Sequence, residues 1–282
     1  MKRAFYIILF IFIVFPFNSL AAEFIKARVS SFYPLQGDVV IITFSDSAPT
    51  ALSAEFNGEP ASVFSYQGLQ RVVFGIPPTK SPGHYPIRVI FKNGEIFEQT
   101  IQVRARGFSK VVLGIPEKLD LTPQTLITKL QSEKVKIEDI VSIKTPEIFF
   151  SSPFGLPLVD NRKVTSLFGE IRKTGDVEIR HLGVDLAGKL GVAVGAINGG
   201  VVKKAYYDTV YGNSVIIDHG QGIFSLYLHL DKIKVKEGDV LKKGALVGTL
   251  GQTGYATSPH LHLSLKIGNI PVDPFRFVSI FK

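Results

Sequence analysis

The sequence of 282 residues contains no cysteine and no tryptophan, and it has a single methionine. Because no thiol is present, disulfides do not hold the chain together, no lipid can be attached through a cysteine, and any zinc site must use histidine and carboxylate ligands. Only 20% of the residues are charged, whereas 45% are hydrophobic. This composition argues against a disordered chain, a collagen, a coiled coil and a disulfide-stapled mini-protein, and the length suggests two domains.

The N-terminal segment has the pattern of a secretory signal peptide over residues 1–22. Lys2 and Arg3 precede an apolar run over residues 4–17, and small residues follow. The run is shorter than the roughly 20 residues that a membrane-spanning helix needs, and Pro16 interrupts its end. We therefore expect cleavage near residue 21 or 22, no stable membrane anchor afterwards, and export to the periplasm, the cell envelope or the medium.

The formal net charge of +8 is concentrated in the C-terminal part of the chain. Residues 161–282 carry 16 basic and 10 acidic side chains, whereas residues 23–160 carry equal numbers of both. The lysines are not interleaved with aromatic residues and form no nucleic-acid-binding motif, so we expect no nucleic-acid partner. On an exported protein this basic surface either faces an anionic cell envelope or keeps the chain in solution.

Residues 23–107 contain short runs of alternating hydrophobic residues that are separated by glycine, proline and asparagine. Strands of this length and spacing predict a small β-sandwich. The stretch Pro82–Tyr85 resembles the strand entry of bacterial immunoglobulin-like domains, so the expected fold is an immunoglobulin-like sandwich. The expected strands include residues 39–44, 71–74, 86–91 and 96–103.

Residues 108–160 have the character of a connector with one short helix. Apolar residues recur at approximate helical spacing over residues 125–140, and Thr122 followed by Pro123 is a typical helix start. Polar residues surround the apolar stripe, so we expect the helix to lie on a surface. The Ser- and Pro-rich stretch over residues 151–157 marks the next boundary.

Residues 161–282 read as closely spaced β-hairpins punctuated by glycines. Strands are expected at residues 214–218, 224–229 and 260–266, among others. No helical pattern of 10–15 residues separates them, which excludes a parallel α/β sheet. The whole chain is therefore predicted to be mainly β.

Five of the six histidines lie between residues 181 and 262. In extended chain, the two residues of His181-x-x-x-Asp185 share one face of a strand, and so do those of His260-x-His262. A catalytic zinc ion takes three protein ligands and leaves one position open. His181, Asp185 and one histidine of the second pair satisfy that count, and spacing alone does not decide which one.

The remaining histidine of that pair would be left, together with His229, for proton transfer or for hydrogen bonding to an oxyanion. His219 and Asn213 lie in segments with turn chemistry, so we expect structural roles for both.

Residues 164–275 resemble the M23 family of zinc metallopeptidases, also called the lysostaphin or LytM-type family. The resemblance implies an antiparallel β-barrel-sandwich domain, one zinc ion per chain held by His181, Asp185 and His262, and catalytic roles for His229 and His260. It also implies hydrolysis of short peptide bonds in bacterial peptidoglycan. The matching motifs are Val164–Gly169, His181-x-Gly183-Val184-Asp185-Leu186-Ala187, Gly199–Val202, Tyr211–Val215, Asp218–Gly220, Tyr227–Leu230, Val235–Val240, Gly251–His262 and Val272–Pro274.

Two positions depart from the family's usual pattern. Leu167 stands where the family often has proline, and Arg172 comes one place later than the commonest spacing. We expect neither residue to touch a metal ligand, so the catalytic assignment is unaffected and only substrate preference is open.

The sequence thus predicts a zinc endopeptidase that cleaves cross-links or bridges between peptidoglycan stem peptides. The alternative is a silent M23-like envelope protein that binds peptidoglycan and activates another hydrolase, which would require a lost ligand or catalytic histidine. The stretch over residues 235–247 is similar to biotinyl and lipoyl carrier domains, but it has no modifiable lysine in a suitable hairpin. A further hypothesis is that the N-terminal domain regulates access to the groove.

Overall fold

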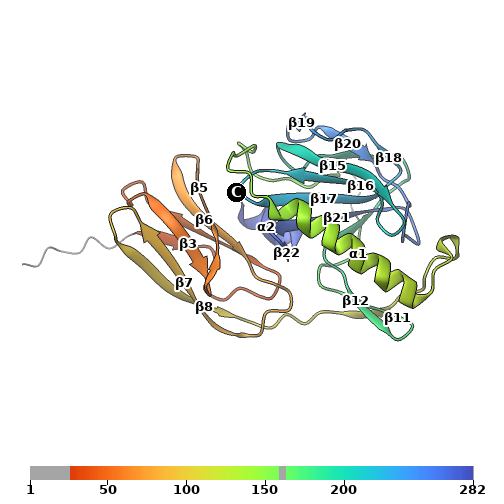
Figure 1. Ribbon diagram of the computed structural model, residues 1–282, viewed down its shortest axis with the longest axis horizontal. Coiled ribbons are helices and arrows are strands. Elements are labelled where there is room, and N and C mark those ends of the chain that lie inside the picture. The colour runs from red at the N-terminus through yellow and green to blue at the C-terminus, as the bar shows by residue number, and fades with distance from the viewer. Residues whose placement is uncertain (1–25, 159–162, 282) are drawn as a thin grey trace, which may run out of the picture.

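The computed structural model describes residues 26–158 and 163–281, and the predicted signal peptide lies outside these ranges. Strands dominate, as the hydrophobic alternation predicts (Figure 1). No helix in the described part of the chain combines the length and the apolar character needed to cross a bilayer.

Two four-stranded antiparallel sheets form the N-terminal part of the molecule. The first contains β1 (Ala27–Val29), β2 (Val39–Phe44), β6 (Leu69–Gly75) and β5 (Ser62–Tyr66), in that order. The second contains β4 (Glu59–Pro60), β3 (Ala51–Phe56), β7 (Gly83–Phe91) and β8 (Ile96–Val103). Alternate residues such as Val40, Ile42 and Phe44 point into a shared core, which makes the predicted β-sandwich. Its immunoglobulin-like identity stays a prediction.

The connector contains β9 (Lys110–Val112), a 3₁₀ turn over Glu117–Leu119 and α1 (Pro123–Ser142). The helix begins as expected, because Thr122 Oγ1 accepts a hydrogen bond from the backbone N–H of Thr125 at 3.2 Å and Pro123 follows the cap. Its buried face packs on the sheet beneath it through Ile137 and Val141 (Figure 1). The helix therefore lies on the domain surface and buries one stripe.

An open, antiparallel sheet of eight strands forms the C-terminal part. Its order is β10 (Lys163–Ser166), β13 (Val184–Ala187), β21 (His260–Ile267), β17 (Ile223–Leu230), β16 (Gly212–Asp218), β15 (Gly200–Asp208) and β19 (Val240–Leu241), with β22 (Ile270–Val272) beside β21. Of the predicted antiparallel β-barrel-sandwich, the antiparallel β-structure is confirmed, but the sheet does not close into a barrel within the described residues. Its outer strands β10 and β19 are short, which limits pairing at the open edges.

Two three-stranded sheets complete this part. One consists of β12 (Val177–Arg180), β11 (Ile171–Thr174) and β9, and the other of β14 (Ala193–Gly195), β20 (Leu246–Thr249) and β18 (Lys232–Ile233). The connector strand β9 pairs in parallel with β11, and this contact was not expected from the sequence.

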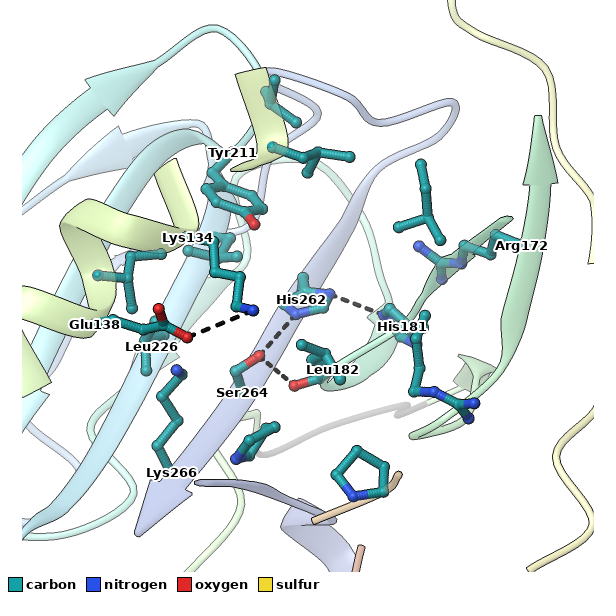
Figure 2. A pocket seen from close by; sticks show the side chains of 18 of the residues that line it. Lys134, Glu138, Arg172, His181, Leu182, Tyr211, Leu226, His262, Ser264 and Lys266 are labelled. Atoms are coloured by element: carbon teal, nitrogen blue, oxygen red, sulfur yellow. Dashed lines mark hydrogen bonds and ion pairs between the residues drawn. The ribbon is translucent and has the colours of Figure 1, made fainter. Parts of the chain in front are cut away.

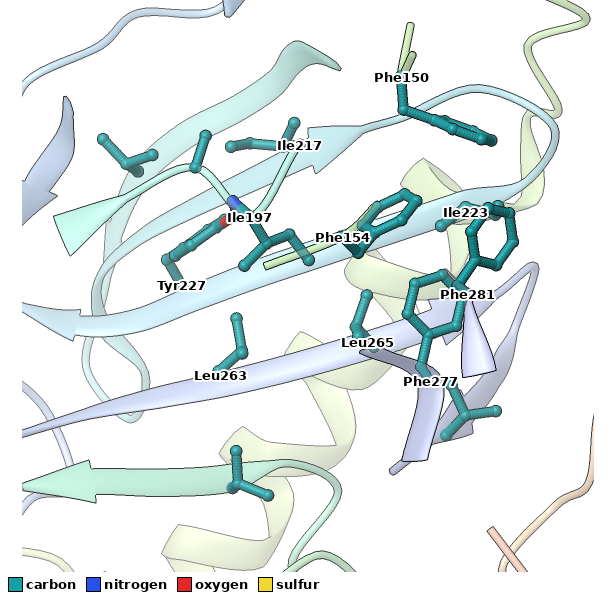
Figure 3. Close-up of a cluster of buried hydrophobic side chains, with 14 of the residues drawn as sticks. Phe150, Phe154, Ile197, Ile217, Ile223, Tyr227, Leu263, Leu265, Phe277 and Phe281 are labelled. Atoms are coloured by element: carbon teal, nitrogen blue, oxygen red, sulfur yellow. Dashed lines mark hydrogen bonds between the residues drawn. The ribbon is translucent and has the colours of Figure 1, made fainter. Parts of the chain in front are cut away.

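The largest buried cluster joins the sandwich to the C-terminal part. Figure 3 shows its portion around Phe150, Phe154 and Phe277. Phe150 and Phe154 approach α2 (Pro274–Ile280), and the ring centroids of Phe154 and Phe277 are 4.8 Å apart. Tyr66 from the sandwich lies 5.2 Å from Phe150 between ring centroids. Because these rings share one core, the two parts pack as a single structural body.

Charged groups reinforce this contact. Arg106 bridges two carboxylates, with Nη2 3.2 Å from Asp38 Oδ1 and Nη1 3.0 Å from Asp273 Oδ2. A Cβ atom on Gly75 would lie 2.8 Å from Val272 Cγ1, so glycine is needed where β6 crosses the end of the C-terminal sheet. The sandwich is thus fixed against β22 and α2.

Candidate active site

Strand pairing brings the predicted metal ligands together. In the register of β13 and β21, Asp185 lies directly opposite His262. Side chains that are directly opposite on neighbouring strands have Cβ atoms only about 5 Å apart, so both groups reach the same point. His181 enters from the segment that precedes β13.

One atom each from His181, Asp185 and His262 converges at this point. Figure 2 shows the two histidines pointing toward each other. His181 Nε2 is 3.0 Å from Asp185 Oδ1 and 2.9 Å from His262 Nδ1, and the latter two atoms are 2.9 Å apart. All three residues are buried. The structure therefore selects His262, and not His260, as the member of the pair that completes the group.

The outward nitrogen of each histidine is already hydrogen-bonded. His181 Nδ1 donates to the Leu167 carbonyl at 2.9 Å. His262 Nε2 donates to Ser264 Oγ at 2.9 Å, and Ser264 donates in turn to the Leu182 carbonyl at 2.7 Å. In the neutral rings, the inward nitrogens consequently present lone pairs to each other and to a carboxylate oxygen. Lone pairs that face one another repel, and a cation placed between them would remove that repulsion. Two imidazole nitrogens and one carboxylate oxygen are a ligand set suited to zinc.

Arg172 holds the other side of the carboxylate. Its Nη2 lies 2.5 Å from Asp185 Oδ2, and its Nε lies 3.2 Å from Glu170 Oε1. The expectation that Arg172 touches no ligand is therefore wrong, because the β11–β12 hairpin folds this side chain onto β13. Arg172 positions the carboxylate so that Oδ1 faces the two histidines.

The electrostatics keep the group ready for a metal ion. Burial acts to raise the pKa of Asp185, but hydrogen bonds and charge from His181 and His262 outweigh it and hold that pKa well below its ordinary value. Burial lowers the pKa of His262 to about 4, although Asp185 opposes the shift. At neutral pH the carboxylate is ionised and His262 is neutral, which are the forms that bind metal.

The two predicted catalytic histidines flank this group. His229 and His260 have ring centroids 4.9 Å apart, and His260 Nε2 is 3.8 Å from Asp185 Oδ1. Each ring donates Nδ1–H to a backbone carbonyl, His229 to Thr253 at 2.9 Å and His260 to Ser258 at 2.8 Å. This arrangement leaves Nε2 of both rings available for a substrate or a water molecule.

The local backbone conformation sets the direction of the His229 side chain. It has a φ of 63°, a left-handed conformation that is unusual for a residue with a side chain, next to a bulge in the pairing of β16 and β17. Burial, with contributions from His260 and His262, holds the pKa of His229 well below its ordinary value. This imidazole is therefore neutral at physiological pH.

His219 and Asn213 lie outside the convergent group. His219 is fully buried, with Nδ1 donating to the Gly199 carbonyl at 2.6 Å and Nε2 2.7 Å from Ser225 Oγ. Burial lowers its pKa to about 4. Asn213 Nδ2 donates to the Asp231 carbonyl at 2.9 Å. The contacts of both side chains are with the protein itself.

A cavity of about 380 Å³ runs from the His181–Asp185–His262 group along β21 and beneath α1 (Figure 2). Its lining includes His181, His229 and His262, apolar residues of α1 and β17, and a loop of the sandwich over residues 77–79. The lining extends from these histidines to Lys266 and to the loop of the sandwich, so the cavity is a groove that reaches beyond the His181–Asp185–His262 group.

Sequence reasoning missed several residues of this groove. Ser264 and Lys266 continue the two-residue period of His260 and His262 on β21, so the alternation could have found them. Arg172 gave no local signal of its contact with Asp185, because only the tertiary fold brings β11 to β13.

Comparison with known proteins relates the C-terminal part of the chain to a family. Residues 179–274 match peptidase family M23. The chain is 38% identical to the peptidoglycan DD-endopeptidase ShyC of Vibrio cholerae over 119 residues, which are 41% of this chain and 27% of that protein. It is 39% identical to the DD-carboxypeptidase/endopeptidase Mpg of Neisseria meningitidis over 94 residues, 33% of this chain and 22% of that protein. The chain thus matches about a quarter of the length of these curated relatives.

The fold has a counterpart among solved structures. A crystal structure from Pseudomonas aeruginosa, described as a peptidase M23, superposes with a TM-score of 0.66 and 24% identity over 88% of this chain and 96% of that chain. At this identity the likeness concerns the fold, and it extends over the sandwich as well as the C-terminal part. Residues 179–274 are therefore the part of the chain that matches peptidase family M23, within a fold that has a counterpart over most of the chain.

Proposed function

We propose that this protein is a zinc-dependent endopeptidase that hydrolyses peptide cross-links or bridges of bacterial peptidoglycan. The observation that carries the proposal is the buried convergence of His181 Nε2, Asp185 Oδ1 and His262 Nδ1 beside two further histidines. Curated relatives of this domain are named peptidoglycan DD-endopeptidases, which supports the substrate class.

His181, Asp185 and His262 would hold the zinc ion through those three atoms. Zinc in a site with three protein ligands supplies a water molecule of lowered pKa and polarises the scissile carbonyl group. Ser264 and Arg172 fix the orientation of His262 and Asp185, respectively, from outside.

His260 and His229 supply the proton transfers. A neutral imidazole with Nδ1–H held by a carbonyl can accept a proton at Nε2 and pass it to the leaving amine. The same Nε2–H, once formed, can donate a hydrogen bond to the developing oxyanion. The two histidines share these roles.

The deciding experiment is mass-spectrometric analysis of cross-linked peptidoglycan after incubation with the full chain. Conversion of cross-linked dimers to monomers is expected with zinc and not after chelation, and the new termini identify the cleaved bond. His260→Ala should abolish most of the conversion, whereas His84→Ala, an exposed histidine on the sandwich, serves as the matched control. Absence of zinc-dependent conversion would refute the proposal and favour the silent, activating alternative.

We also propose that residues 1–22 direct export and that the sandwich influences access to the groove. The second idea is supported by the loop over residues 77–79, which lines the same cavity as His181 and His262. Replacing this loop with a flexible Gly-Ser segment should change the cleavage rate, and an unchanged rate would count against regulation. The mass of the protein recovered from the producing cells tests the cleavage near residue 21 or 22.

A further inference from the structure

On β21, the row of residues that face the cavity continues past the His181–Asp185–His262 group. His260, His262, Ser264 and Lys266 alternate along the strand, and Lys266 lines the same cavity as His262 (Figure 2). Lys266 is only 8% exposed. A lysine this deeply buried is unusual, because an ammonium group loses its hydration when it leaves water.

The surroundings of Lys266 carry an excess of positive charge. Lys134 and Glu138 on α1 lie across the groove, with Lys134 Nζ 3.6 Å from Glu138 Oε1. Glu138 and Lys134 both act electrostatically on Lys266, but within residues 26–158 and 163–281 no carboxylate lies within 4.0 Å of Lys266 Nζ. Two ammonium groups thus share one carboxylate, and one positive charge is not compensated.

The walls around this charge are largely apolar. Leu130 and Ile137 of α1 face Leu226 and Leu228 of β17 across the cavity. An anion that enters such a site meets a lower dielectric than water, so its attraction to an ammonium group is stronger than at the protein surface. Burial lowers the pKa of Lys266 to about 8, so the group is still predominantly charged at pH 7.

The position of Lys266 relates it to the reaction centre. It stands four residues from His262 along an extended strand, which corresponds to roughly 13 Å between their Cα atoms. An extended peptide covers about 3.3–3.6 Å per residue, so this span equals about four residues. Lys266 pairs with Pro271 on β22, and β22 packs against Gly75, just before the loop over residues 77–79 that also lines the cavity. The sandwich therefore bounds the groove at the end where Lys266 lies.

We propose that Lys266, assisted by Lys134, forms a subsite that binds a free carboxylate of the substrate peptide about four residues from the scissile bond. The inference rests on the proposed function and adds a specificity determinant to it. Peptides that carry a carboxylate at that distance bind through a charge-assisted hydrogen bond with Lys266, whereas peptides in which the carboxylate is amidated lose that contact.

The test compares two product peptides of the cleavage that differ only in this carboxylate or its carboxamide. Binding to the zinc-loaded full chain is measured calorimetrically at pH 7. We expect the carboxylate peptide to bind roughly 10- to 100-fold more tightly, as hydrogen bonds to charged groups imply. Lys266→Gln should remove this preference, Lys266→Arg should retain most of it, and Lys234→Gln, an exposed lysine outside the groove, should leave it unchanged.

A second variant and a titration protect the test against effects on folding. Lys134→Gln lies on the helix with its side chain 62% exposed, and it should lose a smaller part of the preference. NMR titration of Lys266 should show its pKa rising when the carboxylate peptide binds. Equal binding of both peptides, no binding of either, or a full preference in Lys266→Gln would overturn the subsite. Failure of the proposed function would instead show as absent cleavage of cross-linked peptidoglycan, whatever the product peptides do.

Discussion

Replacing Ser264 with alanine tests whether the hydrogen bonds behind the ligands prepare the zinc site. The Ser264 hydroxyl accepts a hydrogen bond from His262 Nε2 at 2.9 Å and donates one to the Leu182 carbonyl at 2.7 Å. Ser264 is buried, with 6% of its surface exposed. Alanine leaves the Nε2–H of His262 without an acceptor. The tautomer that is protonated on Nδ1 then becomes as favourable as the one protonated on Nε2, and it blocks the nitrogen that would bind zinc. A buried group that loses its partner costs about 1–3 kcal/mol, and partners of this kind typically change metal affinity 10- to 100-fold.

The assay is a zinc competition with a chromophoric chelator at pH 7, combined with thermal unfolding of the zinc-free and zinc-loaded protein. Ser225→Ala is the matched control, because Ser225 Oγ lies 2.7 Å from Nε2 of His219, a histidine outside the ligand group. Ser225→Ala should lower stability without changing zinc affinity, whereas Ser264→Ala should lower both. Equal zinc affinity in Ser264→Ala and the unaltered protein would refute the reasoning.

Three further predictions concern catalysis, pH and packing. His260→Ala should lower the cleavage rate roughly 10²- to 10⁴-fold with the zinc content unchanged, whereas His181→Ala should lose zinc. Metal analysis beside the rate assay distinguishes the two effects. An unchanged rate in either variant contradicts the assignment. The pKa of His219 is lowered to about 4 by burial, so between pH 6.5 and pH 4 the unfolded chain binds a proton that the folded chain does not, and stability falls as the pH decreases. At pH 5, His219 should lower the free energy of unfolding by about 2 kcal/mol. Urea unfolding should show that the stability of His219→Gln depends less on pH than that of the unaltered protein. Gly75→Ala would place Cβ 2.8 Å from Val272 Cγ1, so we expect the free energy of unfolding to fall by about 1–3 kcal/mol and the thermal midpoint to decrease. An unchanged midpoint would show that β22 can shift away without loss of stability.

The local elements could be predicted because their signals lie within a few residues. Alternating hydrophobic residues gave β2 and β8 with their observed bounds, and Thr122 with Pro123 gave the start of α1. The ligand types were also readable, since a chain without cysteine leaves zinc only histidine and carboxylate. The choice of His262 over His260 needed the family resemblance, because both lie on the same face of one strand.

Long-range pairing explains what the sequence could not provide. The sequence predicted antiparallel strands in the C-terminal part but not their order, because neighbours in the sheet such as β13 and β21 are far apart in the sequence, and the sheet stays open with β10 and β19 at its two ends. Similarly, Arg172 reaches Asp185 only because the β11–β12 hairpin folds back on β13.

By itself, the sequence determined the mainly β character, the helix with its cap and the set of residues able to bind a metal, because periodicity, turn chemistry and side-chain type are local properties. Only the tertiary structure decided that Asp185 stands opposite His262, that the sandwich shares a core with the C-terminal part, and that Lys266 is buried beside Lys134 and Glu138. These facts depend on contacts between segments far apart in the sequence, such as Tyr66 with Phe281, and on the loss of water around them, which no local pattern encodes.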